Sequence, residues 1–185
     1  SLGCQNVYYE EKGAFTGETS VLMIKNYCKY VLVGHSERRH IFGETTADTE
    51  KKIALVLKHG LVPVLCVGET LAEREAGKHK EVVAEQLEAA KNNLPEYHDA
   101  VIVAYEPVWA IGTGKTATPE DAQEMHAFIK SRIQKKTIVL YGGSVKPENA
   151  AELLSQADID GVLVGGASLN PDSFLQIIAK GRQEK

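Results

Sequence analysis

The fold class can be read from a run of six apolar residues, Ala100-Val101-Ile102-Val103-Ala104-Tyr105, which ends at the carboxylate of Glu106. The run shows no alternation of polar and apolar residues, as is typical of a strand that is buried on both faces. Strands of this kind occur in parallel sheets, because helices cover both faces of such sheets. The segment therefore predicts a parallel sheet within an α/β protein.

Four further apolar runs of the same kind recur along the chain, at residues 30–33, 61–67, 137–141 and 159–164. Each is short, rich in Val, Ile and Leu, and separated from the next run by a helical pattern. Strand followed by helix is the signature of the α/β class with a parallel sheet. With the opening segment of the chain, we count six predicted strands.

The helices between these runs carry their own start and stop signals. Thr118 is expected to cap a helix that starts at Pro119, and two later helices are expected to start at Pro147 and Pro171, because proline suits the first position of a helix. No low-complexity linker divides the chain. We therefore expect residues 1–185 to form a single domain.

Composition argues against several classes of protein. The chain is 43% hydrophobic and 25% charged, which is ordinary for a globular chain, and no stretch approaches the roughly 18 apolar residues of a membrane span. No signal-peptide pattern opens the sequence. The net charge of −4 offers no basic patch for nucleic acid. Three cysteines without a CxxC pair predict neither a disulfide framework nor a zinc site, and favour the cytoplasm.

Two glycine pairs, Gly142-Gly143 followed by Ser144 and Gly165-Gly166, stand at the ends of the last two predicted strands. Glycine lets the backbone approach a ligand closely and point several N–H groups at an anion. Barrel enzymes often place a phosphate site after their last two strands. A phosphate site is therefore the hypothesis, and two tight turns are the alternative.

Glu106 closes a buried strand, where a carboxylate is costly unless it is paired or used. Desolvation would make it a stronger base, but a structural ion pair would explain it equally well. The loop behind it favours catalysis, because Pro107-Val108-Trp109 is stiff and Gly112-Thr113-Gly114 is loose, as a lid requires. Gly114-Lys115-Thr116 matches the end of a nucleotide-binding P-loop, but Trp109 stands where its first glycine is needed.

His35 also follows a buried strand, within Gly34-His35-Ser36-Glu37-Arg38-Arg39. A lone histidine at such a position can simply be a core residue. The alternating charges behind it and the start of a helix predict instead an imidazole that stays neutral. A neutral imidazole beside a carboxylate base suits proton transfer at a carbon next to a carbonyl.

Four motifs together resemble the triosephosphate isomerase family, and they are residues 34–39, 104–115, 141–145 and 164–168. The resemblance implies a (β/α)8 barrel and an aldose–ketose isomerase of glycolysis and gluconeogenesis. The implied reaction interconverts dihydroxyacetone phosphate and D-glyceraldehyde 3-phosphate through an enediolate, and no cofactor or metal is implied.

The resemblance also implies a role for each matching residue. Glu106 is the base, His35 is the neutral electrophile and Glu37 supports the hydrogen-bond network of the active site. Residues 107–117 are the lid. The substrate phosphate is held by Gly112, Ser144, Gly165 and Gly166. The loop Gln5–Glu18 resembles the family's third loop, which inserts into a neighbouring subunit, and so implies a homodimer.

The chain departs from the family pattern in two respects. It begins inside the third strand of that pattern, so that only about six of the eight barrel strands are expected. The family's first-strand asparagine and lysine then have no counterpart. The joint between Gln134 and Thr137 is also shorter than in the family.

Three hypotheses for function follow. The first is a triose-phosphate isomerase, with the 185 residues expected to be poorly active by themselves. The second is a non-catalytic remnant that keeps a phosphate-binding or dimerisation surface. The third, a Schiff-base aldolase, requires a lysine at a strand end, and the five predicted strand ends after the opening strand carry none.

Overall fold

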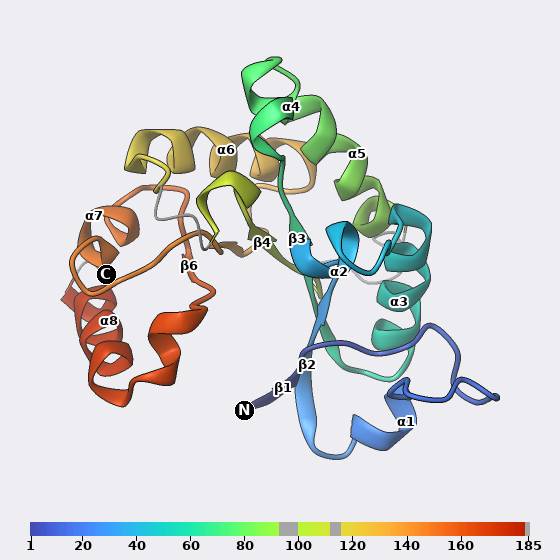
Figure 1. Ribbon diagram of the computed structural model, residues 1–185. Helices are drawn as coiled ribbons and strands as arrows, with labels where there is room; N and C mark the ends of the chain where they lie inside the picture. Colours follow the sequence, from blue (N-terminus) through green and yellow to red (C-terminus); the bar gives the residue numbers. More distant parts are fainter. Residues whose placement is uncertain (93–99, 112–115, 184–185) are drawn as a thin grey trace. The chain divides into compact units, whose positions relative to one another are not determined.

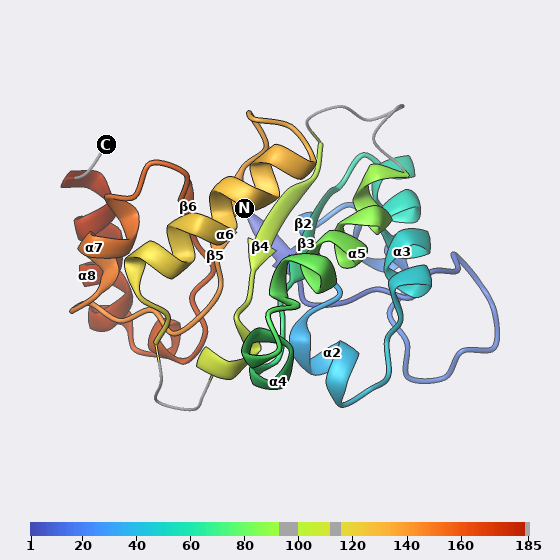
Figure 2. The same ribbon diagram turned by 90° about the horizontal axis from the view of Figure 1, so that it is seen from above.

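A computed structural model describes residues 1–92, 100–111 and 116–183 of the chain. The chain divides into two compact units (Figures 1 and 2). The first unit comprises residues 1–67 and 85–103, and the second comprises residues 68–84 and 104–185.

The first unit contains three parallel strands that pair in the order of the chain. They are β1 (Leu2–Cys4), β2 (Cys28–Val33) and β3 (Val62–Val67), and the beginning of β4 (Ile102–Tyr105) continues the order beside β3. In the register of β2 and β3, Tyr30 lies opposite Val62 and Val33 lies opposite Leu65. Because the strands run parallel, all of them end at the same edge of the sheet.

The helices of this unit are α1 (Val21–Ile24), α2 (Ser36–His40), α3 (Thr46–Lys58) and the later part of α5 (His79–Lys91). The helix α3 packs against β2 and β3. A capping box starts it, since Thr45 accepts from the backbone N–H of Asp48 and the Asp48 carboxylate accepts from that of Thr45. The chain leaves it through Gly60, at a φ of 71°, as expected for a helix end.

The second unit contains the end of β4, followed by β5 (Val139–Tyr141) and β6 (Gly161–Val162), again parallel neighbours in chain order. Its helices α7 (Ala150–Leu154) and α8 (Pro171–Gln183) pack on each other, side by side in both ribbon views (Figures 1 and 2). The remaining elements are α4 (Leu71–Glu75), the start of α5, η1 (Val108–Ala110), α6 (Pro119–Arg132) and η2 (Gly166–Leu169).

The structure confirms most of the predicted elements. The described residues form six strands, and helices start at Pro119, after the cap Thr118, and at Pro171. The predicted start at Pro147 is wrong, because α7 begins at Ala150. Asn149 accepts from the N–H of Lys146 and donates to the carbonyl of Ser144, and such local side-chain bonds hold a turn in place of a first helical turn.

The core of the first unit lies between its strands and α3. Val31, Ile53, Val56 and Leu65 are fully buried there. Burying an aliphatic side chain of this size stabilises a protein by roughly 1.5–3 kcal/mol, so these residues hold the strand ends in place. Within the described ranges, no helix combines the length and apolarity needed to span a membrane.

Truncation of this core is expected to destabilise the protein. Leu65→Ala should lower the free energy of unfolding by about 2–5 kcal/mol, because the side chain is fully buried and its removal leaves a cavity. Leu175→Ala is the matched control, since Leu175 is 61% exposed and should change stability by less than about 0.5 kcal/mol. Urea denaturation measures both, and equal effects would contradict this assignment of the core.

Candidate active site

Glu106 follows the last residue of β4 and is 2% exposed. Two glycines of the second unit pack against it. A Cβ added to Gly68 would overlap the carbonyl oxygen of Glu106, and one added to Gly142 would lie 2.9 Å from its Cγ. The backbone of Gly68 therefore approaches that of Glu106 so closely that only glycine fits there, and Gly142 packs closely against the Glu106 side chain.

The first glycine pair serves packing. The N–H of Gly142 donates to the carbonyl of Tyr105 (2.7 Å), and a Cβ on Gly143 would overlap the hydroxyl group of Tyr141. Ser144 is half-buried, and its carbonyl accepts from the side chain of Asn149 (3.0 Å). The loop after β5 is therefore fixed by close contacts.

The second glycine pair differs from the first. Gly165 and Gly166 are exposed, and a Cβ added to either would meet no heavy atom within 4 Å. The turn that follows is held by Ser168, whose N–H and hydroxyl both donate to the carbonyl of Gly165 (2.9 and 2.7 Å). Packing does not require glycine here, and Gly165 has a ψ of −121°, outside the main regions that residues with a Cβ adopt.

The first end of the predicted lid is fixed by a buried carboxylate, Glu69. It accepts from the indole N–H of Trp109 (2.9 Å), the hydroxyl of Tyr105 (3.0 Å) and the guanidinium of Arg74 (3.0 Å). The backbone carbonyl of Glu69 accepts from the N–H of Val108 (3.1 Å). Three donors on one buried carboxylate offset its desolvation and hold Trp109 in place.

Arg74 extends this network to α6. Its guanidinium stacks on the Trp109 ring, 5.1 Å from the centroid, and donates to Asp121 (2.7 Å). Burial and the charge of Glu69 raise the pKa of Tyr105, so its hydroxyl keeps its proton and acts as a donor. Gly112, the residue predicted to bind phosphate from the lid, lies outside the described residues.

Glu69 is not among the site residues predicted from the sequence, although a signal for it was present. Gly68-Glu69 follows the buried strand β3 as Glu106 follows β4. The argument that a carboxylate at a strand end must be paired or used applies to both. Arg74 and Asp121 carry no comparable signal, because their contact depends on how α4 and α6 pack.

His35 lies at the start of α2, in the first unit, and its side chain is 28% exposed. It is therefore not a core residue. Its Nδ1 accepts from the backbone N–H of Glu37 (3.3 Å), which places the proton of a neutral imidazole on Nε2. The Glu37 carboxylate lies 4.0 Å from Nδ1 and is 68% exposed.

The predicted site residues thus fall into two groups. His35 and Glu37 belong to the first unit, where the structure brings them together at the start of α2. Glu106, Ser144, Gly165 and Gly166 belong to the second. They follow β4, β5 and β6, which are neighbours in the sheet. All of these residues follow the carboxyl ends of strands, where α/β barrel enzymes carry their chemistry.

Comparison with known proteins identifies the family of the chain. A protein-family model described as "Triosephosphate isomerase" matches residues 1–181 of the chain. Proteins named triosephosphate isomerase from Aquifex aeolicus, Hydrogenovibrio crunogenus and Ralstonia nicotianae are 52%, 53% and 54% identical to the chain. These alignments cover 96%, 99% and 95% of this chain and 75%, 77% and 74% of the respective relative.

The parallel sheet and the family match together define a partial (β/α)8 barrel of the isomerase class. The chain belongs to the triosephosphate isomerase family. The alignment with the Hydrogenovibrio protein runs over 195 positions, so that relative contains residues without a counterpart here. This agrees with the expectation that some joints are shorter than in the family.

A buried histidine lies beneath the second unit's part of the site. His126 of α6 is fully buried, with its ring centroid 5.9 Å from that of Tyr105 and 6.3 Å from that of Tyr141. Burial, as the main cause, lowers the pKa of His126 from 6.5 to about 4. The ring is therefore neutral at pH 7.

His126 should make the protein sensitive to acid. Between pH 6.5 and about 4 the unfolded chain binds its proton more readily than the folded chain. The stability it contributes is thus complete above pH 6.5 and is lost as the pH falls toward 4, by at most about 3 kcal/mol. His126→Phe should reduce the loss of stability seen by urea denaturation between pH 7 and pH 4.5. His40→Phe, at an exposed position, should not, and an unchanged pH dependence in His126→Phe would refute the prediction.

Proposed function

We propose that this protein interconverts dihydroxyacetone phosphate and D-glyceraldehyde 3-phosphate by proton transfer through an enediolate. The observation that carries the proposal is the buried carboxylate of Glu106 at the end of β4, in a chain of the triosephosphate isomerase family. A carboxylate in this place is costly unless it is used or paired, and the reaction requires a base.

Glu106 is the proposed base. It removes a proton from the carbon next to the carbonyl and returns it to the neighbouring carbon. The close packing of Gly68 on its backbone and of Gly142 on its side chain supports this role, because general-base catalysis depends on a carboxylate held within hydrogen-bond reach of one proton. The low exposure of Glu106 also limits competition from water.

His35 is the proposed electrophile. Because Nδ1 accepts from the N–H of Glu37, the neutral ring has its proton on Nε2, from which it can donate to the substrate carbonyl. Donation stabilises the negative charge that develops on that oxygen. The proton can then move between the two substrate oxygens through the ring. Glu37 has a supporting role, in the first turn of α2.

Phosphate binding is proposed for the open backbone at Gly165 and Gly166, together with Ser144 and, from the lid, Gly112. The support is the exposed and uncrowded backbone of the second glycine pair. Residues 107–117 would close over the bound substrate. The fixing of Trp109 by Glu69 supports a rigid hinge at the first end of this lid.

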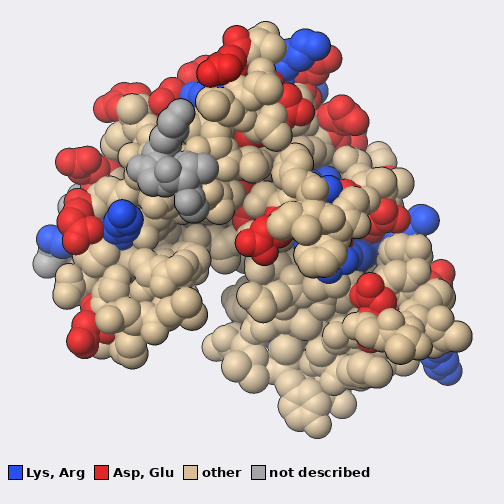
Figure 3. All heavy atoms as spheres, in the orientation of Figure 1, with Lys and Arg blue, Asp and Glu red and all other residues tan. Residues whose placement is uncertain are grey.

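A homodimer is proposed through the loop Gln5–Glu18. An aromatic cluster in this loop consists of Tyr8, Tyr9 and Phe15. The ring centroid of Tyr8 lies 4.2 Å from that of Tyr9 and 4.4 Å from that of Phe15. The surface of the first unit around α1 carries few charged side chains (Figure 3), and Met23 and Tyr27 are exposed there. An exposed apolar surface of this kind favours a protein partner.

Two substitutions test the proposed roles, in a chimera that joins this chain to the part of the Aquifex aeolicus relative outside the alignment. We name it the completed chimera. Glu106→Asp withdraws the carboxylate by about one carbon–carbon bond and should lower kcat by about 100-fold or more. Glu37→Gln should lower it by less than about tenfold. Steady-state isomerase kinetics measure both, and equal, negligible effects would exclude Glu106 as the base.

The 185 residues alone are expected to show very low isomerase activity. In the family pattern a lysine of the first strand stabilises the enediolate, and loss of one preorganised donor costs about 10²–10³ in rate. The measurement compares kcat of the 185-residue chain with that of the completed chimera. Equal kcat values would overturn the expectation, and an inactive chimera that still binds phosphate would favour the non-catalytic alternative.

A further inference from the structure

The residue before His35 is held from both sides by charged side chains. Gly34 has a φ of 71°, and its N–H donates to Oε1 of Glu44 (3.1 Å). Its carbonyl accepts from Nε of Arg39 (2.8 Å), and Arg39 also donates to the carbonyl of Cys66 (3.3 Å), near the end of β3. Both polar backbone groups of Gly34 are thus fixed by groups of the same unit.

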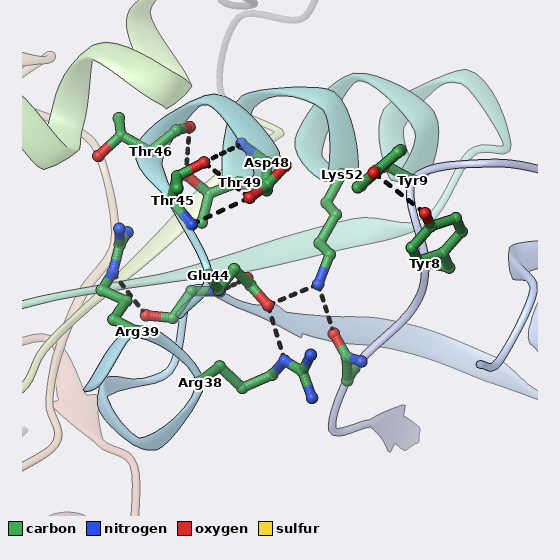
Figure 4. A network of polar contacts seen from close by, with 12 residues as sticks. Tyr8, Tyr9, Arg38, Arg39, Glu44, Thr45, Thr46, Asp48, Thr49 and Lys52 are labelled. Atoms are coloured by element: carbon green, nitrogen blue, oxygen red, sulfur yellow. Dashed lines mark hydrogen bonds and ion pairs between the residues drawn. The ribbon is translucent and has the colours of Figure 1, made fainter. Parts of the chain in front are cut away.

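Glu44 is the centre of a buried network (Figure 4). Its Oε2 accepts from Nζ of Lys52 (2.6 Å) and from Nε of Arg38 (2.7 Å). The side chains of Glu44 and Lys52 are 3% and 4% exposed. Burial by itself would raise the pKa of Glu44, but hydrogen bonds from Lys52 and Arg38 hold it below 4.5. The carboxylate is therefore charged at pH 7.

Lys52 connects this network to a distant part of the sequence. Besides Glu44, its ammonium group donates to Oδ1 of Asn6 (2.8 Å), in the loop Gln5–Glu18. A chain of hydrogen bonds therefore runs from Asn6 through Lys52 and Glu44 to the N–H of Gly34. Hydrogen bonds to charged groups are the stronger ones, and a buried pair that loses one partner is strongly destabilised.

We propose that Glu44 is a positioning residue for His35 and that Lys52 supports it in this role. The proposal rests on the proposed function of His35 as the electrophile. By holding the N–H of Gly34, Glu44 fixes the backbone from which the imidazole projects, and Lys52 fixes Glu44. Neither residue touches the reacting atoms in this scheme.

Small displacements of a catalytic group have large effects on rate. A shift of about 1 Å caused by a remote substitution can cost about 100-fold. Glu44→Gln removes the charge that Lys52 and Arg38 hold, so the side chain should no longer be fixed against Gly34. The expected result is a loss in kcat larger than any change in KM, because the polarisation of the carbonyl grows toward the transition state.

The test uses steady-state kinetics of the completed chimera and compares Glu44→Gln, His35→Gln and the double variant. Glu44→Gln should lower kcat by about 10- to 100-fold, with KM changed by less than about threefold. In the His35→Gln background, Glu44→Gln should cause no further loss of kcat, because residues that act through one another are not additive. A purely structural role would multiply the two losses.

Asp160→Asn is the matched control. Like Glu44, Asp160 accepts from a backbone N–H, that of Val139 in β5 (2.7 Å), and pairs with a lysine, Lys130 (3.0 Å). This contact lies at the opposite end of the strand from the predicted site residues. It should lower stability and leave kcat unchanged. If Glu44→Gln does not fold, Lys52→Met replaces it, with a smaller loss in the same direction.

Two results would overturn the inference. In the first, His35→Gln strongly lowers kcat, but Glu44→Gln lowers it no more than Asp160→Asn does, or lowers it further in the His35→Gln background. Glu44 then does not act through His35, and the proposed function stands. If His35→Gln has normal kcat, the role of His35 is wrong, and the inference falls with it.

Discussion

Close backbone contact at the end of β4 is the constraint on which the rest of the second unit depends. Glu106 lies against Gly68 and Gly142, where no side chain would fit. The N–H of Gly142 is also bonded to the carbonyl of Tyr105. These contacts fix the backbone of Glu106 and limit the space beside its side chain, so the position of the residue is set by the ends of the strands.

Both units stabilise a buried carboxylate by several hydrogen bonds. Each has a buried carboxylate that accepts several charged or polar donors, Glu44 in the first unit and Glu69 in the second. Each also fixes a residue of the proposed site or its neighbour, Gly34 beside His35 and Trp109 at the hinge. Burying a charge is costly unless it is paired and hydrogen-bonded, and here the same hydrogen bonds also fix segments that belong to the proposed site.

Local patterns in the sequence predicted most of the fold, because buried parallel strands and capped helices have strong local signatures. The apolar run before Glu106 was sufficient to predict β4. The cap at Thr118 and the proline at Pro171 were sufficient to predict where α6 and α8 begin. The start of α7 was predicted wrongly because Asn149 bonds to the backbone of its own turn. The contacts of Glu69, and of Glu44 with Lys52, depend on long-range packing, which hydrophobic periodicity does not report.

The candidate site residues were predicted from their position at strand ends and from the family resemblance. The difference between the packed pair Gly142-Gly143 and the open pair Gly165-Gly166 required the structure.

The central claim is that Glu106 removes a proton from the carbon next to the substrate carbonyl. It is tested most directly by NMR of dihydroxyacetone phosphate incubated with the completed chimera in deuterium oxide. A base that exchanges its proton with solvent should place deuterium on that carbon in the recovered substrate, or on the former carbonyl carbon in the product. Glu106→Gln should abolish the incorporation. Undiminished incorporation by Glu106→Gln would contradict the account.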